Sequence, residues 1–77
     1  MKEAKRALAE IIAEADKIKA YAIGDKAFQV SQLLRYKPEE TEEIKICLDE
    51  LIDECEDAEK SELAEKARKV IKEIETD

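Results

Sequence analysis

The chain has 77 residues, of which 45% are charged and 4% are aromatic. This composition, with frequent Ala and Leu, is typical of a helical bundle or coiled coil and excludes a protein built mainly from β-sheets. A chain this short forms one domain, residues 1–77, whose core leaves little net stability and little room for a pocket that would hold a small-molecule substrate.

The net charge of −7 is unevenly distributed along the chain. Residues 1–37 contain eight basic and five acidic side chains, residues 38–59 contain one basic and eleven acidic, and residues 60–77 contain five of each. The acidic middle would repel the phosphates of a nucleic acid and would attract a basic protein. A solvated helix face beside a basic neighbour in the same bundle is the simpler explanation of this pattern.

Neither a targeting segment nor a membrane span is predicted. The opening MKEAKRALAE carries acidic side chains and lacks the apolar run of a signal peptide, and no later stretch is apolar enough to cross a bilayer. We therefore expect a soluble protein, intracellular or simply expressed in that way, without a membrane partner. Cys47 and Cys55 are eight residues apart on one predicted helix, a rise of about 12 Å. Because a disulfide needs Cα atoms within about 7 Å, these two thiols cannot pair with each other there.

Apolar side chains recur at alternating spacings of four and three residues, which predicts a first helix over residues 2–23. They are Ala4, Leu8, Ile11, Ala15, Ile18 and Ala22. Gly24 and Asp25 then predict a tight turn, since Gly accepts the left-handed conformation beyond a helix end and Asp caps the start of the next helix.

A short second helix with two distinct faces is predicted over residues 26–35. The face toward the core comprises Ala27, Val30, Leu33 and Leu34. Phe28, Gln32 and Arg35 lie at i, i+4 and i+7 on another face, with Tyr36 nearby. Pro38 ends this helix, because the residue before a proline leaves the helical region, and Pro38 is the expected first residue of the third helix.

The third helix is predicted to present one apolar face, with Ile46 on the opposite side among carboxylates. That face comprises Ile44, Cys47, Leu48, Leu51, Ile52 and Cys55. The pattern resumes about one residue out of phase at Leu63, Ala67, Val70, Ile71 and Ile74. This shift predicts a break between Glu56 and Ser61 and a separate fourth helix. No repeat of 20 to 50 residues is evident. The expected fold is all-α, an antiparallel bundle of three to four helices with a short second helix.

An enzyme is not expected. The sequence contains no His, which removes the commonest general base and zinc ligand, and its single Gly excludes a glycine-rich phosphate loop. Two Cys without further soft ligands do not form a zinc site, and neighbouring carboxylates raise a thiol pKa rather than lowering it. Carboxylates along a straight helix cannot surround Ca²⁺ or Mg²⁺. The sequence therefore predicts no catalytic residue, no metal and no cofactor.

Recognition of a protein remains as a function. Aromatic and Arg side chains are enriched at interface hot spots, and the second helix carries both types on a face that the core does not use. A helix packed between two neighbours would also need apolar side chains on two sides, so internal packing is the competing interpretation.

The regular use of Ala, Glu, Lys and Ile, the i, i+4 charge pairs and the flanking segments AKRALAEIIAEADK and SELAEKARKVIKEIE resemble computationally designed helical bundles. This resemblance implies either no native role or binding to a chosen target.

A second resemblance is local. Ile23, Gly24 and Asp25 are similar to the Ile-Gly-Asp core of BH3 motifs, the amphipathic helices that bind the groove of Bcl-2-family proteins. The resemblance implies that Ile23 and Asp25 would contact such a groove. The flanking positions depart from the motif, because Asp16, Ala20 and Ala27 stand where it has larger apolar anchors.

The leading hypothesis is a non-catalytic designed scaffold that binds a protein partner through its second helix and the adjoining turn. The predicted contacts are Tyr21, Ile23, Asp25, Phe28, Gln32, Arg35 and Tyr36. The alternatives are a purely structural bundle that folds or self-associates, a BH3-like ligand, and a natural acidic adaptor for a basic partner. The adaptor would use Glu42, Glu43, Asp49 and Asp53.

Overall fold

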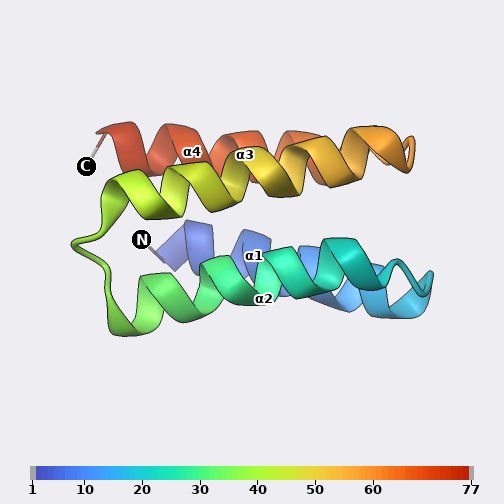
Figure 1. The fold of residues 1–77 in the computed structure, drawn as a ribbon, viewed down its shortest axis with the longest axis horizontal. Coiled ribbons are helices and arrows are strands. Elements are labelled where there is room, and N and C mark those ends of the chain that lie inside the picture. Colours follow the sequence, from blue (N-terminus) through green and yellow to red (C-terminus); the bar gives the residue numbers. More distant parts are fainter. Residues whose placement is uncertain (1, 77) are drawn as a thin grey trace.

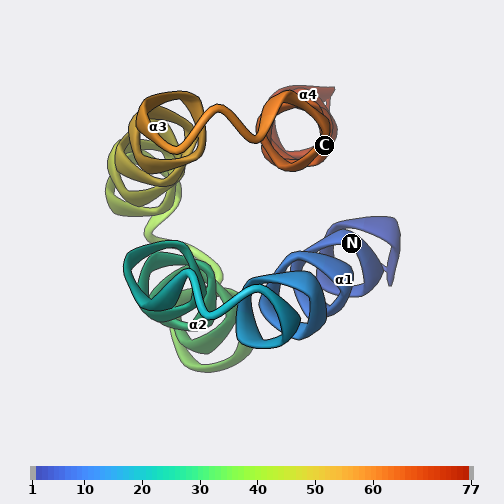
Figure 2. The ribbon, with the colours of Figure 1, turned by 90° about the vertical axis from the view of Figure 1, so that its right-hand side faces the viewer.

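The computed structural model describes residues 2–76 and consists of four helices (Figure 1). They are α1 (Lys2–Lys17), α2 (Tyr21–Tyr36), α3 (Thr41–Asp57) and α4 (Ser61–Thr76). Successive helices run antiparallel, and seen from one end they stand at the corners of a square (Figure 2). Contacts join each helix to both of its neighbours, with α4 packing against α1 to close the ring. The predicted all-α antiparallel bundle is confirmed, with four helices.

One apolar face of each helix builds the core, and no polar side chain among residues 2–76 is buried with it. The largest fully buried side chains are Leu8, Ile11, Ile23, Val30, Ile44, Leu48, Leu51, Cys55 and Val70. All six residues predicted for the apolar face of α3 are buried, whereas Ile46 is 59% exposed on the opposite side, as predicted. Burial of apolar area therefore holds the bundle together.

The first turn lies earlier than the sequence predicted. α1 ends at Lys17, and Lys19 adopts the left-handed conformation with φ of 61°. The Lys19 N–H donates to the Asp16 carbonyl at 3.2 Å and the Ala20 N–H donates to the Ala15 carbonyl at 2.8 Å. These two bonds form a Schellman motif, which satisfies carbonyls left free at the helix end. The predicted helix over residues 2–23 is therefore wrong.

Gly24 and Asp25 lie inside α2, so the predicted turn at these residues is wrong. The prediction of a short second helix is also wrong, because α2 has sixteen residues, like α1 and α4. A Cβ atom added at Gly24 would lie 3.6 Å from the Cβ of Ala15, which is an ordinary van der Waals contact. Gly24 therefore marks a place where α1 and α2 lie close together.

The connection between α2 and α3 spans residues 37–40. Pro38 lies within it, and α3 begins at Thr41, so Pro38 is not the first residue of the third helix as predicted. The break predicted between Glu56 and Ser61 is confirmed, because residues 58–60 form a turn and α4 begins at Ser61.

This last turn repeats the first one, displaced by 40 residues. Glu59 has φ of 60°, its N–H donates to the Glu56 carbonyl at 3.0 Å, and the Lys60 N–H donates to the Cys55 carbonyl at 2.8 Å. α4 also begins and ends 40 residues after α2. The chain thus consists of two equivalent helical hairpins, an N-terminal hairpin of α1 and α2 and a C-terminal hairpin of α3 and α4. The expectation that the sequence holds no repeat is wrong at this level.

The two hairpins also share the register of their cores. Eight buried residues of the N-terminal hairpin have a buried equivalent 40 positions later: Ala4 and Ile44, Leu8 and Leu48, Ile11 and Leu51, Ala15 and Cys55, Ile23 and Leu63, Ala27 and Ala67, Val30 and Val70, Leu34 and Ile74. Only nine of the 35 pairs between residues 2–36 and 42–76 are identical, so the repeat lies in the apolar pattern and the turn geometry.

Candidate protein-binding face

The outer face of α2 carries the large exposed hydrophobic side chains of the N-terminal hairpin. Tyr21 is 65% exposed and Phe28 is 55% exposed, and both are far from the core positions of the same helix. Tyr21, Asp25, Phe28, Gln32 and Arg35 follow one another at spacings of four and three residues, which places them on a single stripe. Asp25 and Arg35 are exposed and Gln32 is half-buried. We call this stripe the α2 outer face.

Tyr36 is 67% exposed and lies beside this stripe. The Arg35 guanidinium carbon is 5.7 Å from the centroid of the Tyr36 ring, a cation–π distance. The structure therefore brings together six of the seven predicted contacts on the outside of one helix.

Ile23 is the exception, because it is 2% exposed and belongs to the core. Since α2 begins at Tyr21 and continues through Gly24, Ile23 is in phase with the buried Ala27 and Val30. The BH3 resemblance implies that Ile23 faces a partner, but in this fold Ile23 faces the bundle interior.

A hollow of about 240 Å³ lies along the contact between α1 and α2, beside Tyr21 and Phe28. Its lining comprises Ile12, Ala15, Asp16, Ala20, Tyr21, Gly24, Asp25 and Phe28. Small side chains line part of it, two aromatic rings lie among its walls, and two carboxylates are present. Sequence reasoning missed Asp16 as a site residue, because the predicted turn at Gly24 left no groove between two antiparallel helices at this point.

The equivalent positions on α4 carry ordinary polar side chains. Tyr21, Asp25, Phe28, Gln32, Arg35 and Tyr36 correspond to Ser61, Glu65, Arg68, Lys72, Glu75 and Thr76. Both helices occupy equivalent places in their hairpins, so the fold does not require aromatic residues at these positions. Comparison of the hairpins could have revealed the site from sequence, had the 40-residue register been recognised.

Electrostatic contacts also differ between the two hairpins. In the C-terminal hairpin, Arg68 donates hydrogen bonds to Glu56 on α3 and to Glu65 on its own helix, the latter at 2.9 Å. The hydrogen bond to Glu56 is the main cause that raises the pKa of Arg68. In the N-terminal hairpin the equivalent carboxylates are Asp16 and Asp25, and Phe28 stands at the equivalent of Arg68.

The acidic outer face of α3 is the other surface that the sequence singled out. Glu42, Glu43, Asp49 and Asp53 are all exposed on it. Its flanks are partly neutralised within the chain, since Lys26 of α2 contacts Glu50 at 2.9 Å and Lys45 lies 3.9 Å from Glu75 of α4. Within residues 2–76, no group of three or more Asp, Glu, Cys or His side chains is arranged to hold a metal ion.

Cys47 and Cys55 are buried free thiols. Burial raises the pKa of both, and neighbouring carboxylates raise it further. A raised pKa keeps the thiols protonated and weakly nucleophilic.

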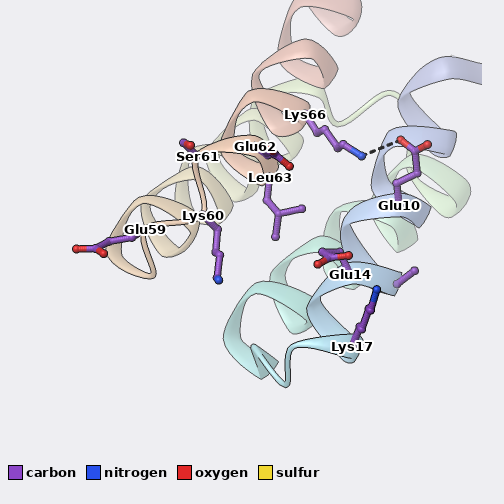
Figure 3. A pocket seen from close by; sticks show the side chains of 10 residues that line it. Glu10, Glu14, Lys17, Glu59, Lys60, Ser61, Glu62, Leu63 and Lys66 are labelled. Carbon is purple, nitrogen blue, oxygen red and sulfur yellow. Dashed lines mark hydrogen bonds and ion pairs between the residues drawn. The ribbon is translucent and has the colours of Figure 1, made fainter.

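A hollow of about 670 Å³ opens between α1 and α4, and most of the residues that line it are charged (Figure 3). Lys66 of α4 bridges it to Glu10 of α1 at 3.3 Å, and Lys60 points into it from the last turn. Charges of both signs line both sides, and Leu63 is in the core at its base. This arrangement is typical of a solvated seam between helices.

The geometry therefore favours the outer face of α2 as the candidate site. None of the helices within residues 2–76 has the length and apolar character needed to cross a membrane. Comparison of the chain with protein-family models, curated proteins and solved structures finds no match.

Proposed function

We propose that the protein is a non-catalytic helical scaffold that binds another protein through the α2 outer face. Phe28 lies at the centre of the contact, with Tyr21 and Tyr36 toward its ends. Aromatic side chains at such positions supply large apolar contact area, which makes them frequent hot spots.

The observation that carries this proposal is the contrast between α2 and α4. The same positions of an equivalent helix hold Ser61, Arg68 and Thr76, which satisfy the hairpin fold without exposing apolar rings to water. The bundle fold therefore does not require exposed rings at Tyr21, Phe28 and Tyr36. A binding role explains why one hairpin carries them.

A different protein is a better partner for this face than a second copy of the chain. Two copies would each bring a net charge of −7. One face of a sixteen-residue helix is about 24 Å long. A strip of that length and the width of one helix face has less area than the roughly 800 Å² that each partner buries in a stable interface. A partner with a groove that encloses the exposed side of α2 and reaches onto the neighbouring helices would come closer to that area.

A face-exchange variant tests the proposal. Tyr21→Ser, Phe28→Arg, Gln32→Lys, Arg35→Glu and Tyr36→Thr together give α2 the side chains that α4 already carries. Helical peptides would be selected from a displayed random library on the immobilised parent protein, and their affinities then measured for both proteins. We expect the selected peptides to compete with one another and to lose at least about tenfold in affinity for the variant, as expected when hot-spot side chains are removed.

The reciprocal control places the aromatic face on α4 with Ser61→Tyr, Arg68→Phe and Thr76→Tyr in the face-exchange background. Recovery of peptide binding there would support the proposal, because the face would act independently of its helix. Peptides that bind the parent and the face-exchange variant equally would contradict it. Light scattering of the parent at two concentrations identifies the remaining case: a dimer that Phe28→Arg dissociates would make a second copy the partner.

A further inference from the structure

We propose that the hollow between α1 and α2 binds an arginine side chain of the protein that contacts the α2 outer face. This inference rests on the proposed function and adds to it the chemistry of one partner residue. The guanidinium would lie between Asp16 and Asp25, with the rings of Tyr21 and Phe28 beside it.

The C-terminal hairpin already contains this arrangement within the chain. Arg68 lines a hollow between α3 and α4 together with Glu56, Glu59, Ser61 and Ala64. Its two terminal nitrogens donate to Glu56 and Glu65, one from each helix of the hairpin. A guanidinium therefore fits between carboxylates at these two positions of this backbone.

The N-terminal hairpin keeps both carboxylates and lacks the cation. Glu56 corresponds to Asp16 and Glu65 to Asp25, whereas the position of Arg68 is occupied by Phe28. Within residues 2–76, neither Asp16 nor Asp25 forms an ion pair. The hollow thus presents two negative charges at the place where the other hairpin binds a positive one.

Nearby basic side chains do not take this role. Lys17 lines the seam between α1 and α4, and Lys26 binds Glu50 of α3 at 2.9 Å on the other side of α2. Lys19 is exposed in the turn and is not among the residues that line the hollow. Within residues 2–76, no basic side chain lines this hollow, so it is open to a cation from a partner.

The remaining lining favours arginine over lysine. A guanidinium is flat and weakly hydrated, stacks on aromatic rings and can donate to two carboxylates at once, whereas an ammonium is a compact, strongly hydrated charge. The hollow replaces Ser61 and Arg68 of the other hairpin with the rings of Tyr21 and Phe28, which offer such stacking surfaces.

An NMR titration tests this inference without knowledge of the partner. N-acetyl-arginine methylamide would be added to the full chain at constant ionic strength and compared with the citrulline analogue, which has the same shape and no charge. We expect the arginine compound to shift the resonances of the Gly24 amide and the Tyr21 and Phe28 rings, with a dissociation constant on the order of 10 mM. The citrulline compound should leave them unchanged.

Three variants sharpen the test. Asp16→Asn with Asp25→Asn should weaken binding of the arginine compound by about five- to tenfold, the effect of losing two exposed charge pairs. Asp49→Asn with Asp53→Asn changes the net charge equally on the α3 face and should leave binding unchanged. Phe28→Arg supplies the guanidinium from within the chain, as Arg68 does, and should abolish binding of the added compound.

Equal shifts with the arginine and citrulline compounds, or equal affinities of the two double variants, would overturn the inference. So would the absence of any localised shift. The proposed function fails separately, when the selected peptides do not distinguish the face-exchange variant. Peptides that require Phe28 but bind the Asp25→Asn variant with unchanged affinity would support the α2 outer face as a binding site and would contradict the arginine in the hollow.

Discussion

The two hairpins have equivalent turns and the same core register, yet their second helices present different surfaces to solvent. Arg68 of α4 donates to one carboxylate of α3 and one of α4, whereas Phe28 of α2 lines a hollow with one aspartate of α1 and one of α2. The interior therefore determines the fold of each hairpin, and the outer face is free to differ. This difference locates the candidate site more directly than any motif within it.

The strongest test of the equivalence is in the core, where Leu8 and Leu48 are both fully buried. Each Leu→Ala substitution should lower the free energy of unfolding by about 2–5 kcal/mol through lost burial and a cavity. Urea denaturation measures this cost, with added trimethylamine oxide if a variant unfolds without denaturant. Clearly unequal costs would mean that the two cores are packed differently despite their common register.

The turns should respond alike to glycine. Lys19 and Glu59 both occupy the left-handed region, which costs a residue with a Cβ roughly 1 kcal/mol. Lys19→Gly and Glu59→Gly should each raise the free energy of unfolding by up to that amount, as measured by urea denaturation. A gain in only one hairpin would show that side-chain contacts of the other turn offset its backbone cost.

Gly24→Ala would make the two hairpins more alike in sequence, because the residue equivalent to Gly24 is Ala64. Gly24→Ala should stabilise the protein by about 0.5–1 kcal/mol, since a helix-interior Gly is unfavourable and the added Cβ makes an ordinary contact with Ala15. Thermal and urea unfolding measure the change. A loss of stability would mean that α1 and α2 cannot accommodate the methyl group.

The thiols introduce a pH dependence that only the C-terminal hairpin has. Burial raises the pKa of Cys47 and Cys55 above the ordinary value of 9.0. The folded state therefore retains protons that the unfolded state releases, so this stability is complete below about pH 9 and is lost as pH rises through the raised pKa. Cys47→Ala with Cys55→Ala, which matches Ala7 and Ala15, should reduce the fall in stability between about pH 8 and pH 10, as measured by urea denaturation. An unchanged slope would assign the fall to other groups.

The smallest expected effect is that of the surface exchange on stability. Giving α2 the outer residues of α4 should change the free energy of unfolding by no more than about 0.5 kcal/mol, as surface substitutions usually do. A core Phe would cost about 3–5 kcal/mol on truncation, so a large loss for Phe28→Ala alone would return this residue to a packing role.

Sequence reasoning predicted most of the fold because apolar periodicity reports directly on burial. The face of α3 could be identified in full, and the phase shift after Cys55 indicated the last turn. The first turn was missed because a Schellman motif with Lys19 in the left-handed position contains no residue typical of a turn, while Gly24 gave a misleading signal inside a helix. The repeat was obscured because equivalent core positions hold different apolar residues, such as Ala15 and Cys55.

The candidate site was predictable only in part. Spacing placed Phe28, Gln32 and Arg35 on one face, and the composition of that face indicated recognition. Ile23 was predicted as a contact because Gly24 indicated a turn beside it, whereas α2 continues through Gly24 and buries Ile23 in the core. Asp16 comes from another helix, and only the packing of α1 against α2 places it in the hollow with Asp25.

The interface between the two hairpins resembles the isologous interface of a symmetric dimer, because α1 packs on α4 just as the equivalent α3 packs on α2. The chain is thus organised as a dimer of hairpins joined covalently through residues 37–40. A true homodimer of one hairpin would present every surface feature twice. Joining the two copies in one chain lets the candidate binding face occur once in each molecule, which would give the proposed complex a stoichiometry of one partner for each chain.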